Sequence, residues 1–437
     1  MIKFENYKSS NIFWLNKIPQ NWKNIRGKDL FIEYSIKGHG DLPLLAASQK
    51  QGVVLKTMLE SRSMEAQKDF DNFKLVKIGD FVISLRSFEG GIETAYYTGV
   101  ISPAYTVFNF ITNEENDTSY FKYLFKSSSF ISFLQSSITG IRDGQSVKFK
   151  EIQNAFFGIP NLEVQYKIGT FLDTKTKAID NKIEILLKKI SNYKEYRKRV
   201  INDAVTKGLN NDCKTKCSEY DFEVNNNFNL FRLKDLGYLY SGLSGKSGDD
   251  FNQDENKNNK GFIPFTNIAN NTYLKKDHLG AVVVYENENQ NKVQKGDIFF
   301  LMSSEGYEDI GKSAILDDDL EETYLNSFCK GYRVTNKKAN PYFLNYLLLS
   351  DSYRKQLTIE GKGFTRINLK MEKVNDFKVY LPNSIDEQTK IVQFLDQKTQ
   401  TIDNIIVNIN KQIETLKELR KTLINDVVTG KIKVVDN

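Results

Sequence analysis

The 437-residue sequence predicts an α+β protein that is built twice, with two similar globular domains alternating with two long helices. Three observations lead to this fold class. Stretches of the second half repeat the first half, each half contains one segment with heptad patterning, and each half contains short β-rich runs separated by turns. We expect the two long helices to pair with one another.

The repeat is clearest in the helical segments, where residues recur 223 positions later. The matched residues include Phe171 and Phe394, Leu172 and Leu395, Asp173 and Asp396, Thr176 and Thr399, Asp180 and Asp403, Arg197 and Arg420, and Asn202 and Asn425. Upstream the match is weaker, as where "VKIGDFVIS" from Val76 faces "VQKGDIFFL" from Val293. The predicted order is a domain at 1–158, a helix at 159–208, a domain at 209–380 and a helix at 381–437.

Each helical segment carries residues spaced alternately four and three positions apart, which is the a/d pattern of a coiled coil. The alternative is that each seam packs only on its own domain, although a surface helix usually has a wider apolar stripe. A paired portion of about 32 residues would be about 48 Å long. The predicted seam consists of Ile179, Ile183, Leu186, Ile190, Tyr193, Arg197, Val200 and Ala204 in the first helix, and Ile402, Ile406, Ile409, Ile413, Leu416, Arg420, Leu423 and Val427 in the second.

Arg197 and Arg420 interrupt the seam at equivalent positions. Each arginine either fixes the register or reaches an acidic partner, or it extends its charge to solvent along an apolar surface. Pro160 and Pro382 precede acidic first turns, which is typical of a helix start.

The globular segments predict mixed α and β structure. The runs "DFVISL", "AYTVFNF", "GAVVVY" and "DIFFLM" are β-rich and alternate with turns. One helical region per copy is predicted by "TSYFKYLFKSSSFISFLQ" and "ANPYFLNYLLLSDSYRKQL".

Composition limits the classes of protein to consider. The net charge of +6 is compatible with a polyanionic partner. The apolar runs are too short for a bilayer span and the N-terminal segment lacks the apolar centre of a secretory signal, so we expect a cytoplasmic protein. Cys213, Cys217 and Cys329 predict neither a disulfide framework nor a zinc site. The only histidines, His39 and His278, stand in polar loops, which disfavours histidine-based catalysis.

Together these features resemble the specificity (S) subunit of type I restriction-modification systems. The resemblance covers nearly the whole chain. It rests on the opening "WLNKIPQNW" from Trp14, the glycine–aspartate pair before a strand in each half, the "P…Q…I…FLD…T…ID" entry to each long helix, and the duplicated helices.

The resemblance implies that the globular segments are target recognition domains that bind double-stranded DNA, each reading one half of a bipartite, asymmetric target. It also implies that the helices form an antiparallel coiled coil about a pseudo-two-fold axis, set the spacer and dock two methyltransferase subunits, which methylate adenine at N6. Two restriction subunits would join when the assembly is a nuclease. This chain would then bind no cofactor or metal itself, with S-adenosylmethionine held by the methyltransferase subunits and ATP and Mg by the restriction subunits.

Candidate DNA contacts lie in three pairs of loops, chosen because they follow predicted strands or precede the last strand of a domain. Polar side chains there can bond to base edges, and lysine and arginine can bond to phosphates. The candidates are Ser48, Gln49 and Lys50 with Thr266 and Asn267; Ser84, Arg86 and Ser87 with Ser303 and Ser304; and Arg142, Gln145 and Ser146 with Thr365 and Arg366. We expect Trp14 and Trp22 to be core or docking aromatics.

The alternative function is ATP binding, or a coiled-coil scaffold. The segment "GYEDIGKS", Gly306–Ser313, matches the phosphate-binding loop pattern. Such a loop requires a helix whose N-terminus meets the phosphates, but "AILDDDLEE" follows, and Glu308 and Asp309 stand where the loop should be neutral or basic. We therefore expect a recognition-domain hairpin here. The adenine-methyltransferase Asn/Asp-Pro-Pro-aromatic motif is also missing, so we expect a non-catalytic subunit.

Overall fold

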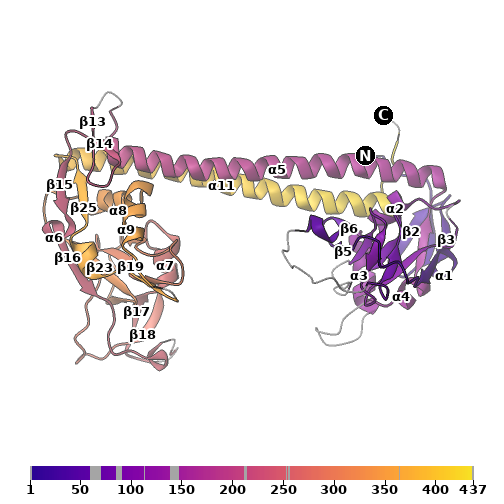
Figure 1. Ribbon diagram of the computed structural model, residues 1–437, viewed down its shortest axis with the longest axis horizontal. Coiled ribbons are helices and arrows are strands. Elements are labelled where there is room, and N and C mark those ends of the chain that lie inside the picture. The colour runs from indigo at the N-terminus through magenta and orange to yellow at the C-terminus, as the bar shows by residue number, and fades with distance from the viewer. Residues whose placement is uncertain are drawn as a thin grey trace. The chain divides into compact units, whose positions relative to one another are not determined.

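The computed structural model describes residues 2–59, 70–84, 91–112, 114–137, 147–210, 214–251, 253, 256–363 and 365–435. They form two compact units, in each of which a globular domain is joined to segments of two long helices (Figure 1). Unit 1 comprises Met1–Leu187 and Asn410–Asn437, and unit 2 comprises Lys188–Ile409. In the part of the chain that is described, no helix is long and apolar enough to cross a membrane.

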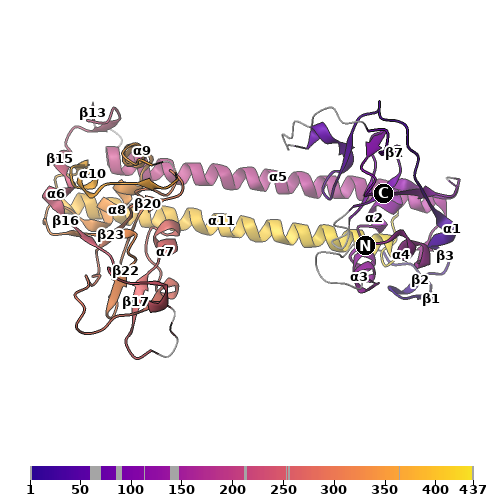
Figure 2. The ribbon, with the colours of Figure 1, turned by 60° about the horizontal axis from the view of Figure 1, so that its bottom comes forward.

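The two longest helices are α5 (Leu162–Lys207) and α11 (Ile385–Val428). The N-terminal part of α5 and the C-terminal part of α11 belong to unit 1, and the remaining parts of both belong to unit 2. The helices therefore run antiparallel within each unit, and both ribbon views show them side by side (Figures 1 and 2). This confirms the predicted antiparallel pairing.

Burial along α5 and α11 follows the heptad seam. Every predicted seam position is buried or partly buried. Leu186 and Ile413 are 7% and 4% exposed, whereas Ile185 and Leu187, which flank the seam, are 61% and 54% exposed. This narrow buried stripe distinguishes a coiled-coil seam from the wider apolar face of an ordinary surface helix.

Each domain contains a four-stranded antiparallel sheet with the same strand order. In unit 1 the order is β4 (Phe31–Tyr34), β11 (Thr106–Phe110), β8 (Phe81–Ile83) and β9 (Ile92–Thr94). In unit 2 it is β16 (Gly237–Ser241), β23 (Cys329–Val334), β19 (Ile298–Leu301) and β21 (Ser313–Ile315). The identical order confirms that the α+β domains are duplicated.

The remaining elements surround these sheets. Unit 1 also contains β1 (Tyr7–Ile12), β2 (Leu15–Pro19), β3 (Lys23–Arg26), α1 (Gly27–Leu30), β5 (Leu45–Ser48), β6 (Gly52–Leu55), β7 (Lys74–Val76), β10 (Gly99–Ile101), α2 (Thr118–Leu124), α3 (Ser128–Ser137), α4 (Phe149–Asn154) and β12 (Phe156–Ile159). Unit 2 also contains β13 (Thr215–Cys217), β14 (Glu223–Asn225), β15 (Asn229–Arg232), α6 (Leu233–Leu236), β17 (Asn259–Ile263), α7 (Phe265–Asn270), β18 (Gly280–Val283), β20 (Ser303–Ser304), β22 (Thr323–Leu325), α8 (Pro341–Leu349), α9 (Asp351–Ile359), β24 (Ile367–Asn368), α10 (Met371–Asn375) and β25 (Lys378–Leu381).

Each domain core includes residues from the helix of the other repeat. In unit 1, the aromatic core around Phe31 and Phe108, whose ring centroids lie 5.5 Å apart, also contains residues at the C-terminal end of α11. These are Leu423, Ile424, Val427 and Val428. In unit 2, the C-terminal end of α5 supplies Ile201, Ala204 and Val205 to the core. Because burying one such side chain stabilises by about 1.5–3 kcal/mol, neither core is complete without the other repeat's helix.

The two tryptophans lie where the sequence predicts core aromatics. Trp22 is 3% exposed and belongs to the unit 1 core. Trp14 packs against Phe130, and its indole N–H donates to the Phe156 carbonyl at 3.1 Å. Both therefore serve the fold of the first domain.

Candidate nucleic-acid interface and the contacts that support it

In unit 1 a group of polar side chains joins α2 to α5. The Tyr123 hydroxyl donates to Asp173 Oδ1 at 2.7 Å and lies 3.0 Å from Thr176 Oγ1. Lys122 Nζ lies 2.6 Å from the same carboxylate oxygen. Burial, together with the neighbouring carboxylate, raises the pKa of the Tyr123 hydroxyl, so it keeps its proton and donates. We call Tyr123, Asp173 and Thr176 the tyrosine clamp of unit 1.

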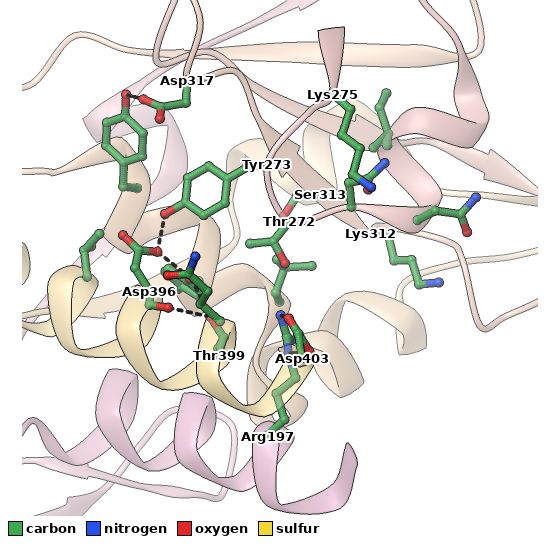
Figure 3. Close-up of a pocket in the computed structure, with 18 of the residues that line it drawn as sticks. Arg197, Thr272, Tyr273, Lys275, Lys312, Ser313, Asp317, Asp396, Thr399 and Asp403 are labelled. Atoms are coloured by element: carbon green, nitrogen blue, oxygen red, sulfur yellow. Dashed lines mark hydrogen bonds and ion pairs between the residues drawn. The ribbon is translucent and has the colours of Figure 1, made fainter. Parts of the chain in front are cut away.

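Unit 2 repeats the tyrosine clamp with residues 223 positions later. The Tyr346 hydroxyl on α8 donates to Asp396 Oδ1 at 2.7 Å and lies 3.5 Å from Thr399 Oγ1. Here the second donor to the carboxylate is the Tyr273 hydroxyl, at 2.6 Å, in place of a lysine (Figure 3). The residues that attach each domain to its long helix are thus the same, while one surrounding donor differs.

The two arginines that interrupt the seam pair with aspartates on the opposite helix. In unit 2, Arg197 Nε and Nη2 donate to the two carboxylate oxygens of Asp403 at 3.1 and 3.3 Å. In unit 1, Arg420 Nε lies 2.9 Å from Asp180 Oδ1. The equivalent pairs show that α5 and α11 have the same antiparallel register in both units. They are partly exposed, so each contributes little to stability, about 1 kcal/mol at most.

Asparagines on the long helices hold the helix that follows the tyrosine clamp. Asn425 Oδ1 accepts the Ser129 backbone N–H at 3.0 Å in unit 1, and Asn202 Oδ1 accepts the Ser352 backbone N–H at 3.0 Å in unit 2. The first backbone N–H groups of a helix have no partner within the helix. The repeated asparagine therefore caps the start of α3 and of α9.

The repeated entry to each long helix also has a structural explanation. Gln165 accepts the Asp117 backbone N–H at 2.9 Å and donates to the Pro160 carbonyl at 3.0 Å. Gln388 accepts the Asn340 backbone N–H at 2.8 Å and donates to the Pro382 carbonyl at 3.1 Å. Both glutamines are fully buried. The proline–glutamine pattern thus fixes the first turn of each long helix to its domain.

The aspartate of each glycine–aspartate pair is buried in its domain. Asp80 accepts the Tyr34 hydroxyl, the Lys77 backbone N–H at 2.5 Å and the Asn109 side-chain amide at 2.7 Å. Burial raises the pKa of the Asp80 carboxyl, because desolvation outweighs these hydrogen bonds. This motif is therefore part of the scaffold.

In unit 2 the same carboxylate has a cationic partner. Asp297 accepts the Tyr240 hydroxyl at 2.6 Å and the Gln294 backbone N–H at 2.8 Å. Arg333 Nε and Nη2 donate to its two oxygens at 2.8 and 2.6 Å, and this hydrogen bonding raises the pKa of the Arg333 guanidinium. Both domains thus contain a buried aspartate. In unit 1 it accepts hydrogen bonds from uncharged groups, and in unit 2 it also pairs with an arginine.

Each unit has a polar cleft between its domain and its helix segments. The cleft of unit 1 has a volume of about 760 Å³, and the cleft of unit 2 has a volume of about 970 Å³ (Figure 3). The tyrosine, the two aspartates and the arginine described above line both clefts. The clefts are therefore equivalent at the helices and differ on the domain side.

The first pair of predicted DNA-contacting loops lies beside these clefts. Gln49 and Lys50 are exposed and line the cleft of unit 1, while the Ser48 hydroxyl accepts the Gln51 backbone N–H at 3.4 Å. In unit 2, Thr266 is exposed on α7. Asn267 is fully buried, and its side chain donates to the Lys275 carbonyl at 2.9 Å. This internal role speaks against the predicted DNA contact of Asn267.

The unit 2 loops of the second and third predicted pairs lie side by side. Ser303 and Ser304 form β20, which pairs with β24, and Thr365 and Arg366 directly precede β24. The two serines are only 8% and 5% exposed, whereas Thr365 and Arg366 are exposed.

In unit 1, Ser84 at the end of β8 lines a separate cleft of about 360 Å³ with Lys148 and Lys150. The remaining predicted DNA contacts lie outside the described residues. These are Arg86, Ser87, Arg142, Gln145 and Ser146. Their contacts, like those of the exposed loop residues in both units, stay predictions.

One exposed aromatic residue was not among the sequence candidates. Phe328 is 52% exposed, and the Arg366 guanidinium lies over its ring with Cζ 4.7 Å from the centroid. An aromatic residue between strands is usually part of a core, so its residue type alone indicates a buried position. Its place in the turn between β22 and β23, where Asn326 and Ser327 are residue types that favour turns, was the available signal.

Gly306–Ser313 forms a turn that leads into strand β21, which pairs antiparallel with β19. The expected hairpin is therefore confirmed. Lys312 Nζ bonds to Asp309 Oδ1 at 2.6 Å, and the Ser313 hydroxyl donates to Asn345 Oδ1 at 2.8 Å. The lysine and the serine that would hold a nucleotide are thus engaged within the protein, and a strand stands where a phosphate-binding loop needs a helix.

Comparisons with solved structures identify the fold. A structure from work on complex assembly and conformational transition of the type I R-M system has a TM-score of 0.72 and 13% identity, and covers 95% of this chain and 99% of that chain. The HsdS subunit from Thermoanaerobacter tengcongensis has a TM-score of 0.56 and 14% identity, and covers 95% of this chain and 98% of its own.

Comparisons of sequence agree. The type I restriction enzyme MjaVIII specificity subunit of Methanocaldococcus jannaschii is 26% identical over 453 residues, which cover 99% of this chain and 97% of that protein. The model of the type I restriction modification DNA specificity domain matches residues 19–189 and again residues 225–415. Since these two matches span most of the chain and correspond to the two repeats, the chain belongs to the family of type I restriction-modification DNA specificity subunits.

Proposed function

We propose that each of the two domains binds one half of a bipartite, asymmetric DNA sequence and that the paired helices fix the spacer between the halves. The observation that carries this proposal is the repeat itself. The contacts that attach a domain to α5 and α11 recur residue for residue, while the exposed loops differ between the domains. Because the domains differ while their attachments to the helices are the same, we expect them to bind two different half-sites. Duplex DNA has two-fold symmetry, so two equivalently attached domains can each contact one half-site.

The repeated helix segments also favour two equivalent partners. We propose that one methyltransferase subunit docks on each unit and supplies the chemistry, with S-adenosylmethionine as its methyl donor and adenine N6 as its target. Restriction subunits with ATP and Mg would join this assembly to make it a nuclease. This chain would contribute recognition and bind no cofactor of its own.

The proposal is tested by producing the chain with its methyltransferase subunit in a host that lacks other adenine methylation. Single-molecule sequencing of the host DNA should find N6-methyladenine in one bipartite motif. Replacing residues 1–158 with the first domain of another specificity subunit should change one half of that motif and leave the other half as it was. A change in both halves would contradict the assignment of one half-site to each domain.

The role of the helices is tested by adding one heptad to both α5 and α11. Seven residues lengthen a helix by about 10.5 Å, which corresponds to about three base pairs of duplex DNA. The spacer of the methylated motif should lengthen by about that number, while both half-sites stay the same. A spacer of unchanged length would show that the helices do not set it.

A further inference from the structure

Arg366 differs from the other arginines that the structure describes in the second domain. Arg232 pairs with Asp235 at 2.9 Å, and Arg333 pairs with Asp297. Arg354 donates to the Glu308 carbonyl at 2.9 Å. Within the described ranges, no carboxylate pairs with Arg366, and its guanidinium lies instead over the face of Phe328. It is therefore available to an external acceptor.

Backbone contacts of the described residues around Arg366 tie it to the domain. Lys362 and Asn368 exchange backbone hydrogen bonds of 3.0 and 2.9 Å, which close the loop, and the Asn368 side chain donates to the Arg366 carbonyl at 3.2 Å. Gly363 has φ +150°, and a Cβ there would lie 1.9 Å from the Arg366 carbonyl oxygen, so the loop requires glycine. The pairing of β24 with β20 fixes the loop to the domain.

The backbone of the turn that carries Phe328 is also held in place. The Phe328 backbone N–H donates to Asn326 Oδ1 at 2.9 Å, and the Cys329 backbone N–H donates to the Asn326 carbonyl at 3.1 Å. A cation over an exposed ring gains about 0.5–1 kcal/mol. The contact restricts the long arginine side chain before any ligand arrives, which lowers the entropy cost of binding.

The equivalent place in the first domain is built differently. There the Tyr105 backbone N–H donates to the Ser102 carbonyl at 3.1 Å in the turn before β11, as the Cys329 N–H does to Asn326 in the turn before β23. Because β11 and β23 hold the same place in the two sheets, Ala104 corresponds to Phe328. Ala104 lines the cleft of about 360 Å³ together with Ser84, Lys148 and Lys150. One domain therefore has an arginine on an aromatic ring where the other has a polar, lysine-lined hollow.

We propose that Arg366 is a specificity-determining residue whose guanidinium binds the O6 and N7 edge of a guanine in the half-site of the second domain, with Phe328 as its support. A planar guanidinium matches these two acceptors, and this is the commonest specific contact between proteins and DNA. The location agrees with this role. The surface around Arg366 and Phe328 differs from the equivalent surface of the first domain, whereas the contacts of both domains with the long helices are repeated. The inference rests on the proposed function.

The test uses the complex of the full chain with its methyltransferase subunit and compares Arg366→Ala, Arg366→Lys and Phe328→Ala. Lys337→Ala, which removes an exposed cation elsewhere on the same domain, is the matched control. Binding of the complex to duplexes with the methylated motif, and to duplexes substituted at each base pair of the second half-site, is measured by fluorescence anisotropy. Thermal unfolding checks that each variant is folded.

In the wild-type complex, replacing one particular guanine should weaken binding by about 5- to 150-fold. Arg366→Ala should remove that discrimination at this one position, so that the motif found by methylation sequencing accepts other bases there. Arg366→Lys should lose most of the discrimination but keep more affinity, because it retains the charge without the bidentate fork. Phe328→Ala should relax the same position by a smaller factor.

Two outcomes would overturn the inference. In one, the second half-site contains no guanine whose recognition changes in Arg366→Ala. In the other, Arg366→Ala weakens binding to every duplex equally and lowers the salt dependence, as loss of a phosphate contact would. Failure of the proposed function is a distinct result, because the wild-type complex would then yield no bipartite motif at all.

Discussion

Units 1 and 2 differ least where they contact the long helices and most where their loops are exposed. The tyrosine clamp, the arginine–aspartate ion pair and the asparagine cap recur with equivalent residues in both units. The site around Ala104 in one domain and Phe328 in the other has no such agreement. Within one chain, repeated contacts thus mark what both copies must do alike, and divergent contacts mark what each copy does alone.

The comparison predicts its largest effect in the coiled-coil seam. Ile190 in unit 2 and Ile413 in unit 1 occupy equivalent positions and are 8% and 4% exposed. An aspartate at either position would bury an unpaired charge, so each substitution should cost about 3–5 kcal/mol of unfolding free energy. Denaturant unfolding measures this cost, with Val407→Asp, at a position 51% exposed, as a control that should cost under about 0.5 kcal/mol. A large loss for one isoleucine alone would contradict the equivalence of the two units.

Replacing the buried aspartate should have a different cost in stability in each domain. Asp297→Asn leaves the Arg333 guanidinium without its carboxylate and should cost about 3 kcal/mol. Asp80→Asn leaves no buried cation behind, because the nearby Lys77 is exposed. It should cost only about 1 kcal/mol, since the amide still accepts one hydrogen bond. Chemical denaturation of both variants checks the difference. Equal costs would mean that the arginine in the second domain adds nothing to the burial of its aspartate.

The buried Asp80 also predicts how the stability of the chain depends on pH. Because burial raises the pKa of Asp80, the folded chain keeps a proton that the unfolded chain releases above its ordinary pKa of about 3.9. Over that window the contribution of Asp80 to stability falls as the pH rises, and above the folded pKa the loss is complete. The cost of Asp80→Asn should therefore become smaller as the pH rises from about 4 to neutrality. Unfolding free energies of both proteins across this range measure the trend, and a cost that grows with rising pH would contradict it.

Removing the tyrosine hydroxyl of the clamp should have the same moderate cost in stability in both units. Tyr123→Phe and Tyr346→Phe each remove one buried hydroxyl that donates to an aspartate, and each should cost about 1 kcal/mol. The carboxylates retain a second donor, Lys122 in unit 1 and Tyr273 in unit 2. Removing Tyr273 as well should therefore increase the cost in unit 2 beyond the single change. Thermal unfolding of the single and double variants tests this coupling.

The smallest effect is expected at the two seam arginines. Arg197→Met and Arg420→Met remove partly exposed ion pairs and place an apolar side chain in the seam, so stability should change by under about 1 kcal/mol in either direction. Thermal unfolding is the measurement. A loss of several kcal/mol in both variants would show that the ion pairs, and not the apolar seam, hold the helices in register.

The helix pairing could be predicted from the sequence because a heptad pattern depends on neighbours along one segment. The repeat also identified Asp173, Thr176 and Asn202 as residues with a shared role. Their partners could not be predicted, since the Tyr123 hydroxyl reaches Asp173 across 50 positions of sequence and the Ser129 N–H reaches Asn425 across 296. Such contacts depend on the tertiary fold, which local periodicity does not encode.

The candidate DNA contacts show the same limit. Loop positions were inferred from predicted strands, and this correctly placed Arg366 at the surface beside β24. It also selected Asn267, which is buried because the segment after Pro264 forms helix α7 and folds its amide inward. Phe328 was missed for the opposite reason, because an aromatic residue near strands is usually part of a core.

The exchange of helix ends between the two cores has a consequence for synthesis of the chain. The residues that complete the first core, Leu423 to Val428, leave the ribosome after the entire second domain has been translated. At about 5–20 residues per second, the first domain waits about 10–40 s for them after its own repeat has emerged. The domain that is made first is thus the last to be finished. A premature stop codon just before Leu423 would leave the core of the second domain intact and the core of the first domain incomplete.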